Sequence, residues 1–387
     1  MIRLLLTIGL GLQIGNAVGA EPLQVRVQPT QFVGAAGCKS SSCHGGAGEK
    51  RSQFITWTRR DIHTRGYATL TNARSERIAA ALDVSQHKEG ASAATMNARC
   101  TVCHSPFQII AAQQAVPTVD PAESVSCESC HGAAGSWLRG HTRPDWTYAT
   151  RVGVGMRDLK SLYVRANTCV ACHQNLDDDI AAAGHPQLVF ELDGQSNAEP
   201  KHWRDPEDSG ARAWLTGQAA ALRELSWHLA TRGTAQEDAV MQWRGLTWLL
   251  SKVTAAQGGT LRIDSADNFA RTQQQADALA RSSAQQSFSS EFVARLTRDL
   301  AATESEFHET GETPHDVLFW RARRLALALE RLSAFANRTR GNAGQPAELA
   351  ELQQDLRWPG EFNAAQFAGR LRVYRRSLDG AVRRIAR

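Results

Sequence analysis

Residues 125–143 read VSCESCHGAAGSWLRGHTR, and within them two cysteines, separated by two residues, are followed at once by a histidine: Cys127-Glu128-Ser129-Cys130-His131. This pattern is typical of covalent c-type haem attachment. The two thiols add to the vinyl groups of the porphyrin, and the adjacent imidazole binds one axial face of the iron. His141 follows ten residues later and is a candidate ligand for the opposite face of some haem.

The pattern occurs four times in the chain. Residues 100–104 (CTVCH) and 169–173 (CVACH) repeat it, and residues 38–44 (CKSSSCH) form a wider copy with four residues between the thiols. In chain order the copies are called motifs one to four. They use all eight cysteines of the chain, and we expect four covalently attached haem c groups. The attachment cysteines are Cys38, Cys43, Cys100, Cys103, Cys127, Cys130, Cys169 and Cys172.

Other uses of paired cysteines account less well for these motifs. A disulfide scaffold does not require a histidine after every second cysteine, and a thioredoxin-like dithiol is expected once, beside a βαβ pattern. Two CxxC units can also supply four thiolates to zinc. The histidine that ends every copy favours haem over these alternatives.

The first 20 residues have the pattern of a secretory signal peptide. Arg3 precedes a short apolar run, and small residues lead up to Glu21. The run is interrupted by Gln13 and Asn16 and is shorter than the roughly 20 residues that cross a bilayer. No later stretch is long and apolar enough to span a membrane. We therefore expect a periplasmic protein with no transmembrane segment after cleavage.

Length and charge limit the remaining possibilities. A chain of 387 residues is long for one domain, and its composition changes near residue 205. We expect a signal peptide at 1–20, a tetrahaem domain at 21–205 and a helical domain at 206–387. The net charge of +5 is not concentrated in a basic stretch with interleaved aromatic residues, so the sequence gives no indication of nucleic-acid binding.

The two expected domains have different compositions. Residues 21–205 are rich in Gly, Ser, Asn and His, and such a segment buries little apolar area from its own side chains. Four porphyrins would supply the missing core. From about residue 209, Ala, Leu, Arg, Gln and Glu predominate. We expect a mainly α protein: a haem-cored domain with little regular strand, followed by a bundle of five to seven helices.

The clearest helix signal in the C-terminal half is at Thr313-Pro314-His315-Asp316, a Thr N-cap followed by Pro at the first helical position. An apolar stripe follows, formed by Leu318, Ala322, Leu325, Leu329, Leu332 and Ala336. Similar patterns cover residues 211–231, 235–256, 265–284, 287–306 and 361–385. The histidines of this half, His228, His308 and His315, are interpreted as helix-face or cap residues.

Three parts of residues 35–205 resemble the tetrahaem cytochrome c554 family and related periplasmic multihaem cytochromes. The first is the pattern Trp57, His63, Ala68 and Leu70 after motif one. The second is the stretch 125–132 with Trp137 and His141. The third comprises Gly184-His185-Pro186 and His202-Trp203.

In that family the haems are closely packed, and a histidine distant from an attachment site ligates the iron of another haem. The resemblance implies His44, His104, His131 and His173 as proximal ligands. It implies His63, His141 and His185 as distal candidates, followed by His87 and His202. Five candidates exceed four irons, so at least one is expected to have no iron. Cytochrome c554 itself has a five-coordinate haem at its second motif and no histidine at the position where this chain has His87.

The leading functional expectation is electron transfer between redox partner proteins through closely packed, mostly bis-histidine haems. The alternative is a multihaem oxidoreductase in which one five-coordinate haem, at motif two, acts on a small nitrogen or sulfur compound. A third possibility is a fixed electron-input subunit of a larger complex. Whether the protein is an enzyme stays open, and the carrier is favoured.

Overall fold

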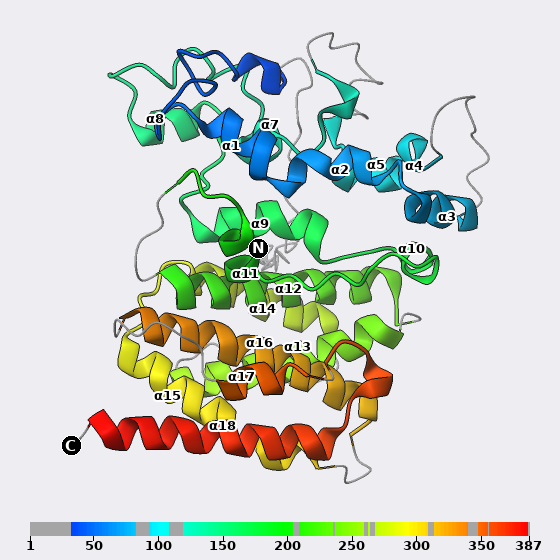
Figure 1. Cartoon of the computed structure of the whole chain (residues 1–387), viewed down its shortest axis with the longest axis vertical. Coiled ribbons are helices and arrows are strands. Elements are labelled where there is room, and N and C mark those ends of the chain that lie inside the picture. Colours follow the sequence, from blue (N-terminus) through cyan, green and yellow to red (C-terminus); the bar gives the residue numbers. More distant parts are fainter. Residues whose placement is uncertain are drawn as a thin grey trace, which may run out of the picture.

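The computed structural model of the protein describes residues 32–82, 93–107, 119–203, 209–234, 237–258, 262–263, 268–308, 313–339, 347–354 and 356–385. All regular structure within these ranges is helical, with no strand. The predicted mainly α fold is confirmed. In Figure 1 a loose upper layer of short helices and loops lies over a stack of long helices, with the C-terminal helix at the far end. The expected signal peptide and His87 lie outside the described residues.

The upper layer contains short helical segments joined by loops and turns. Its α-helices are α1 (Gln53–Arg60), α2 (Gly66–Thr69), α3 (Ala73–Ala81), α4 (Ala93–Met96), α5 (Ala98–His104), α7 (Cys127–His131) and α8 (Tyr148–Gly153). Its 3-10 turns are η2 (Ala35–Gly37), η3 (Ile62–Arg65) and η4 (Pro121–Glu123). Next come α9 (Leu162–His173), α10 (Asp178–Ala182) and α11 (Leu192–Ala198), which in Figure 1 lie between this layer and the long helices.

The long helices form the bundle. They are α12 (Ser209–Arg232), α13 (Glu237–Gln257), α14 (Phe269–Ser283), α15 (Ser290–Ala301), α16 (His315–Thr339) and α18 (Ala364–Ile385). Shorter segments are η5 (Glu304–Phe307), α17 (Ala347–Leu352) and η6 (Pro359–Glu361). The predicted bundle of five to seven helices is confirmed, and the predicted stripe of α16 is buried along its length.

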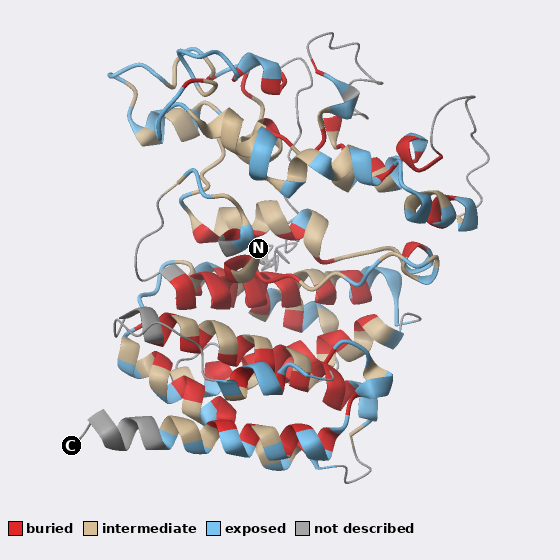
Figure 2. Ribbon diagram, in the orientation of Figure 1, coloured by how far each residue is buried: buried red, intermediate tan, exposed pale blue. Residues whose placement is uncertain are grey.

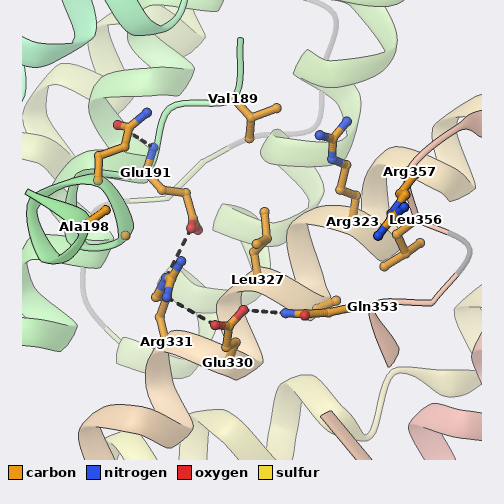
Figure 3. A pocket seen from close by; sticks show the side chains of 13 residues that line it. Val189, Glu191, Ala198, Arg323, Leu327, Glu330, Arg331, Gln353, Leu356 and Arg357 are labelled. Carbon is orange, nitrogen blue, oxygen red and sulfur yellow. Dashed lines mark hydrogen bonds and ion pairs between the residues drawn. The ribbon is translucent and has the colours of Figure 1, made fainter. Parts of the chain in front are cut away.

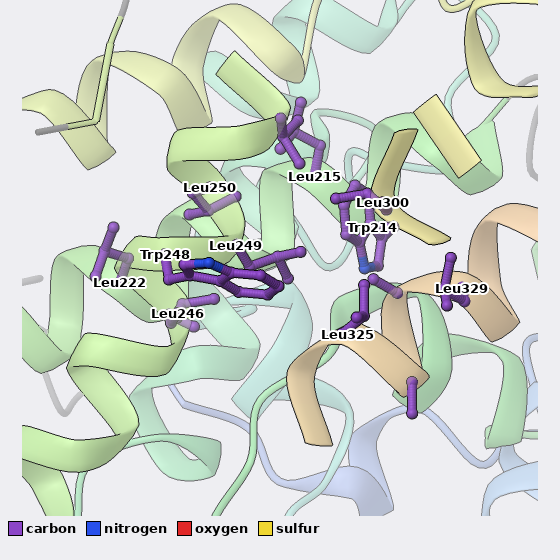
Figure 4. Close-up of a cluster of buried hydrophobic side chains, with 14 of the residues drawn as sticks. Trp214, Leu215, Leu222, Leu246, Trp248, Leu249, Leu250, Leu300, Leu325 and Leu329 are labelled. Atoms are coloured by element: carbon purple, nitrogen blue, oxygen red, sulfur yellow. The ribbon is translucent and has the colours of Figure 1, made fainter. Parts of the chain in front are cut away.

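Large aromatic and aliphatic side chains fill the centre of the bundle. Trp214, Trp243 and Trp320 are almost completely buried, and Figure 4 shows Trp214 and Trp248 among leucines from several helices. In Figure 2 buried residues line the facing sides of the long helices, whereas much of the upper layer is exposed or half-buried. Trp227 on α12 is only half-buried.

The main core extends across the expected domain boundary at residue 205. Leu162, Ala166 and Val170 on α9 belong to the same buried cluster as the bundle, and so do Phe190 and Leu192. The helix that contains motif four therefore packs on the bundle. The boundary itself stays a prediction.

The upper layer has little apolar core of its own. Its buried clusters are small: one consists of Leu70, Ala79, Ala93 and Ala94, and the other of Phe32, Phe107 and Val119. This sparse packing is what the composition predicts for a segment organised around large apolar cofactors. No helix of the described residues has the length and apolar character needed to cross a membrane.

Candidate haem-binding sites

Three of the four attachment motifs end α-helices. Motif two lies on α5, motif three forms α7 and motif four closes α9. In a helix, residues three and four apart lie on the same face, so each CxxCH directs its two thiols and its imidazole to one side. Local capping fixes where these helices begin. Ser126 and Ser129 form a reciprocal capping box at the start of α7, and the Ser161 side chain caps α9.

Motif one is a compact loop instead. The amide of His44 donates to the carbonyl of Cys38 at 3.2 Å, which brings the two ends of the motif together despite the wider spacing. Gly45 makes this closure possible, because a Cβ atom there would lie 1.8 Å from the carbonyl oxygen of Lys39. The loop therefore requires glycine directly after the motif histidine.

Each motif histidine faces a histidine that is distant in sequence. The ring centroids are 6.1 Å apart for His44 and His141, 6.3 Å for His104 and His185, 6.2 Å for His131 and His202, and 6.0 Å for His173 and His63. The pairs combine all four proximal candidates with four of the five distal candidates. No proximal histidine is left for His87.

These separations fit an iron between the two rings. With metal–nitrogen bonds of about 2.0 Å and nitrogens about 1.1 Å from their ring centroids, two imidazoles on one iron have centroids roughly 6.2 Å apart. The angle between ring planes ranges from 18° to 84°, and rotation about the axis through the iron permits this range. The residues present thus fit a haem iron at each pair.

Hydrogen bonds hold several of these rings with Nε2 free to face the iron. The Nδ1 atom lies near an oxygen in four cases: Gln53 Oε1 at 3.0 Å from His44, the Leu138 carbonyl at 2.6 Å from His141, Asp61 Oδ1 at 2.9 Å from His63, and the Pro186 carbonyl at 2.8 Å from His185. A ligating imidazole commonly donates its other N–H in this way, which fixes its tautomer and orientation. These oxygens are suitable acceptors.

Burial favours neutral side chains at the third and fourth motifs. It is the main cause that lowers the pKa of His131 to about 4, and it raises the pKa of the Cys130 thiol to about 11 and that of Cys169 to about 12. A neutral imidazole is the form that binds a metal. Burial around α7 and α9 therefore disfavours the charged forms of these groups.

The attachment motifs follow one another in space in the order one, three, four, two. Cys38 of motif one lies close enough to Cys127 of motif three to lower the pKa of its thiol, and Cys172 of motif four lowers the pKa of Cys103 in motif two in the same way. Cys130 of motif three lies close enough to motif four to raise the pKa of Cys169. Motifs one and two are thus the ends of the series.

Several polar residues that support the sites were not singled out from the sequence. Glu128, inside motif three, is buried and accepts hydrogen bonds from the amides of Val33 and Gly34 at 2.8–3.2 Å and from that of Ala134 at 2.7 Å. Burial raises the pKa of this carboxyl group, and the amide hydrogen bonds oppose the rise. Glu128 thus ties the chain before motif one to motif three.

Asp61 and Gln53 were also missed as partners of ligand candidates. Asp61 terminates α1, and its side chain caps η3, so it separates α1 from the turn that contains His63. The sequence did contain a signal for Asp61, because an aspartate side chain commonly accepts a hydrogen bond from the backbone amide two residues later, and that residue is His63. Gln53 carries no comparable signal in the sequence.

A cavity of about 460 Å³ lies between α11, α16 and the loop after α17. Figure 3 shows its polar wall, in which Arg331 bridges Glu191 and Glu330. The lining includes neither cysteine nor histidine, so we assign no haem to it. Its connection to the sites is Gln195, whose Nε2 is 3.5 Å from His173 Nδ1.

The thiols do not form the alternative structures. All eight cysteines are free, and no three His, Cys, Asp or Glu side chains converge as a metal site anywhere in the part of the chain that the structure describes. Neither a disulfide scaffold nor a four-thiolate zinc site is present among these residues. The paired histidines and neighbouring thiols fit haem attachment.

Comparison with known families gives the same assignment. The family model of cytochrome c554 and c-prime matches residues 25–132, a minority of the chain that includes motifs one to three. This segment is similar to cytochrome c554 and c-prime. The resemblance noted in the sequence is confirmed. Comparisons with curated proteins and with solved structures gave no significant match.

The match to this family model indicates a c-type cytochrome of electron transfer with covalently bound haem c. Cytochromes of this family are typically extracytoplasmic. The matched segment contains His63 but ends before motif four and before His141, His185 and His202. The assignments of these distal residues rest on the sequence and on the geometry described above.

Proposed function

We propose that the chain is a periplasmic tetrahaem cytochrome that passes electrons between redox partner proteins and that each of its four irons is held by two histidines. The observation that carries the proposal is the set of four histidine pairs with ring centroids 6.0–6.3 Å apart. Every pair joins one motif histidine to one histidine outside the motifs. An accidental arrangement would not pair all four motif histidines at the same separation.

The order of the motifs supports a relay. When bound, each haem would supply an iron that accepts and releases one electron. The chain contributes the spacing, because neighbouring thiols join motif one to three, three to four and four to two. The terminal motifs also have exposed residues: Cys43 in motif one and Val102 in motif two. We assign contacts with the electron donor and acceptor to these two ends.

The bundle is proposed to support motif four. Leu162, Ala166 and Val170 fix one face of α9 in the bundle core, and Cys169 of motif four packs against the same core. Gln195 on α11 adds a second contact through His173. We propose the division near residue 205 as a functional boundary rather than as a break in packing.

The alternative of an oxidoreductase with a five-coordinate haem at motif two is less well supported. It requires an open position opposite His104, but His185 faces this ring at 6.3 Å. No described residue pattern favours a substrate pocket at that position. We therefore propose a carrier in which axial ligands on both sides of each iron exclude small substrates.

Two measurements on exported holoprotein test the proposal. Pyridine haemochrome analysis should give four covalently bound haems per chain. Low-temperature EPR of the oxidised protein should give only low-spin ferric signals, because two imidazoles produce a strong axial field. A high-spin ferric signal would favour the oxidoreductase, and fewer than four haems would contradict the tetrahaem assignment.

A further inference from the structure

One ligand candidate differs from the others in its hydrogen-bond acceptor. The Nδ1 atoms of His44, His141 and His185 lie near an amide or carbonyl oxygen, all of which are uncharged. The Nδ1 atom of His63 instead lies 2.9 Å from the Asp61 carboxylate. Among the acceptors described for these rings, Asp61 is the one with a full negative charge.

Asp61 is held in position by the local backbone. Its Oδ1 atom accepts from the amide of His63 at 3.0 Å as well as from the ring of the same residue, and its own amide donates to the Trp57 carbonyl at the end of α1. Only 14% of the side chain is exposed. The carboxylate is therefore fixed beside the ring and partly protected from solvent screening.

A second carboxylate faces the same ring from another element. Glu199, which caps the end of α11, has Oε1 3.9 Å from His63 Nδ1. This distance is too long for a hydrogen bond, so Glu199 contributes charge alone. Arg165 is the nearby cation that acts on Glu199. The Asp61 hydrogen bond is consequently the feature on which the inference depends.

A carboxylate that accepts the N–H of an axial imidazole makes this ligand more basic and more electron-donating. Such a ligand stabilises the ferric state over the ferrous state and lowers the reduction potential. We propose that Asp61 lowers the reduction potential of the haem held by His63 and His173 and makes it the lowest of the four. This inference rests on the proposed bis-histidine ligation and deepens it.

The haem held by His63 and His173 would occupy an inner position in the series of motifs. Motif four lies inside the series one, three, four, two, between motifs three and two. A low potential at this inner position makes it the last of the four to be reduced. In partly reduced protein, electrons would then reside on either side of it.

The test is a redox titration of the holoprotein followed by EPR, in which four low-spin signals disappear on reduction. In D61N one midpoint should rise by at least the equivalent of a tenfold change in the reduced-to-oxidised ratio, about 59 mV. The signal that moves should be the last to disappear in the unmodified protein. D61E keeps the charge and should shift the midpoint by a smaller amount. D145N is the matched control, because Asp145 pairs with Arg143 on the exposed surface.

The reciprocal variant is Gln53→Glu, which places a carboxylate on His44 Nδ1 in place of the amide oxygen at 3.0 Å. It should lower the midpoint of a different haem, that of motif one, by a comparable factor. If D61N loses a haem, the Q53E result decides the matter, and an unchanged midpoint in Q53E overturns the inference.

Different outcomes would contradict the role of Asp61 and the proposed bis-histidine ligation. D61N could retain four low-spin signals with no midpoint potential shifted by more than the equivalent of a threefold change in the reduced-to-oxidised ratio. That result would overturn the role of Asp61 and leave the ligation intact. So would four such signals in which the affected haem is not the last to be reduced. High-spin signals or missing haems in the unmodified protein would contradict the ligation itself.

Discussion

His104 and His185 face each other across motif two with ring centroids 6.3 Å apart and ring planes inclined by 67°. His104 ends α5, whereas His185 follows α10 and is directed by the carbonyl of Pro186, 2.8 Å from its Nδ1. The two rings thus have the separation expected of axial ligands at the one motif where cytochrome c554 itself has an open iron.

Replacing His185 with alanine should open that position. We expect H185A to lose one low-spin ferric signal and to gain a high-spin signal, because one axial imidazole is removed. Added imidazole should restore the low-spin form. H308A is the control, since His308 is an exposed residue of the bundle. Unchanged low-spin signals in H185A would assign the sixth ligand to another residue.

Replacing Glu128 should destabilise the upper layer. E128A leaves the amides of Val33, Gly34 and Ala134 without their acceptor, and each buried donor left unpaired costs roughly 1–3 kcal/mol. We expect the free energy of unfolding to fall by about 3–5 kcal/mol, measured by denaturant unfolding of the holoprotein. E361A, at an exposed glutamate in η6, should change little. Equal stability of the two variants would contradict this role.

Gly217 allows α12 to approach α11. A Cβ atom at this position would lie 2.7 Å from the Cβ atom of Leu192, and such overpacking typically costs about 1–3 kcal/mol. G217A should therefore lower the melting temperature. In G369A, an added Cβ on α18 would meet no atom within 4 Å, and the helix should gain roughly 0.5–1 kcal/mol. The two alanine variants should shift the melting temperature in opposite directions.

Glu191 should make stability depend on pH. Burial raises its pKa above the ordinary value of 4.5, and the charges of Arg331 and Arg324 oppose the rise only in part. Because the folded state binds the proton more tightly than the unfolded state, this contribution is full below pH 4.5 and is lost as the pH rises through the higher folded pKa. E191Q removes the titrating group, so the difference in stability from the unmodified protein should change over this range. Parallel stability–pH curves would contradict the raised pKa.

Much of the bundle was predictable from sequence because its helices are amphipathic. The apolar stripe from Leu318 to Ala336 is buried as expected, and helix α16 begins within two residues of the Thr313 cap. Helix α17 was missed because Ala347–Leu352 is too short to show a period. The packing of α9 on the bundle was missed for another reason. The apolar residues Leu162, Ala166 and Val170 lead into the haem-attachment motif, and the segment was interpreted from that motif alone.

At the sites, the attachment motifs were visible from local spacing, but the pairing of ligands was not. His202 was placed after His63, His141 and His185 among the distal candidates, yet its ring lies 6.2 Å from that of His131. Such pairing depends on long-range packing, which sequence periodicity does not reveal. The assignments of His63, His141, His185 and His202 to iron stay predictions, with the ring separations in their support.

Helix α9 shares its core with α12 and later helices, which follow it in the chain. During synthesis the last attachment motif therefore emerges before the surface against which it will rest. A chain that stops near residue 205 would present Cys169 and Cys172 on a helix whose apolar side has no partner. Maturation of motif four should accordingly be the step most sensitive to premature termination.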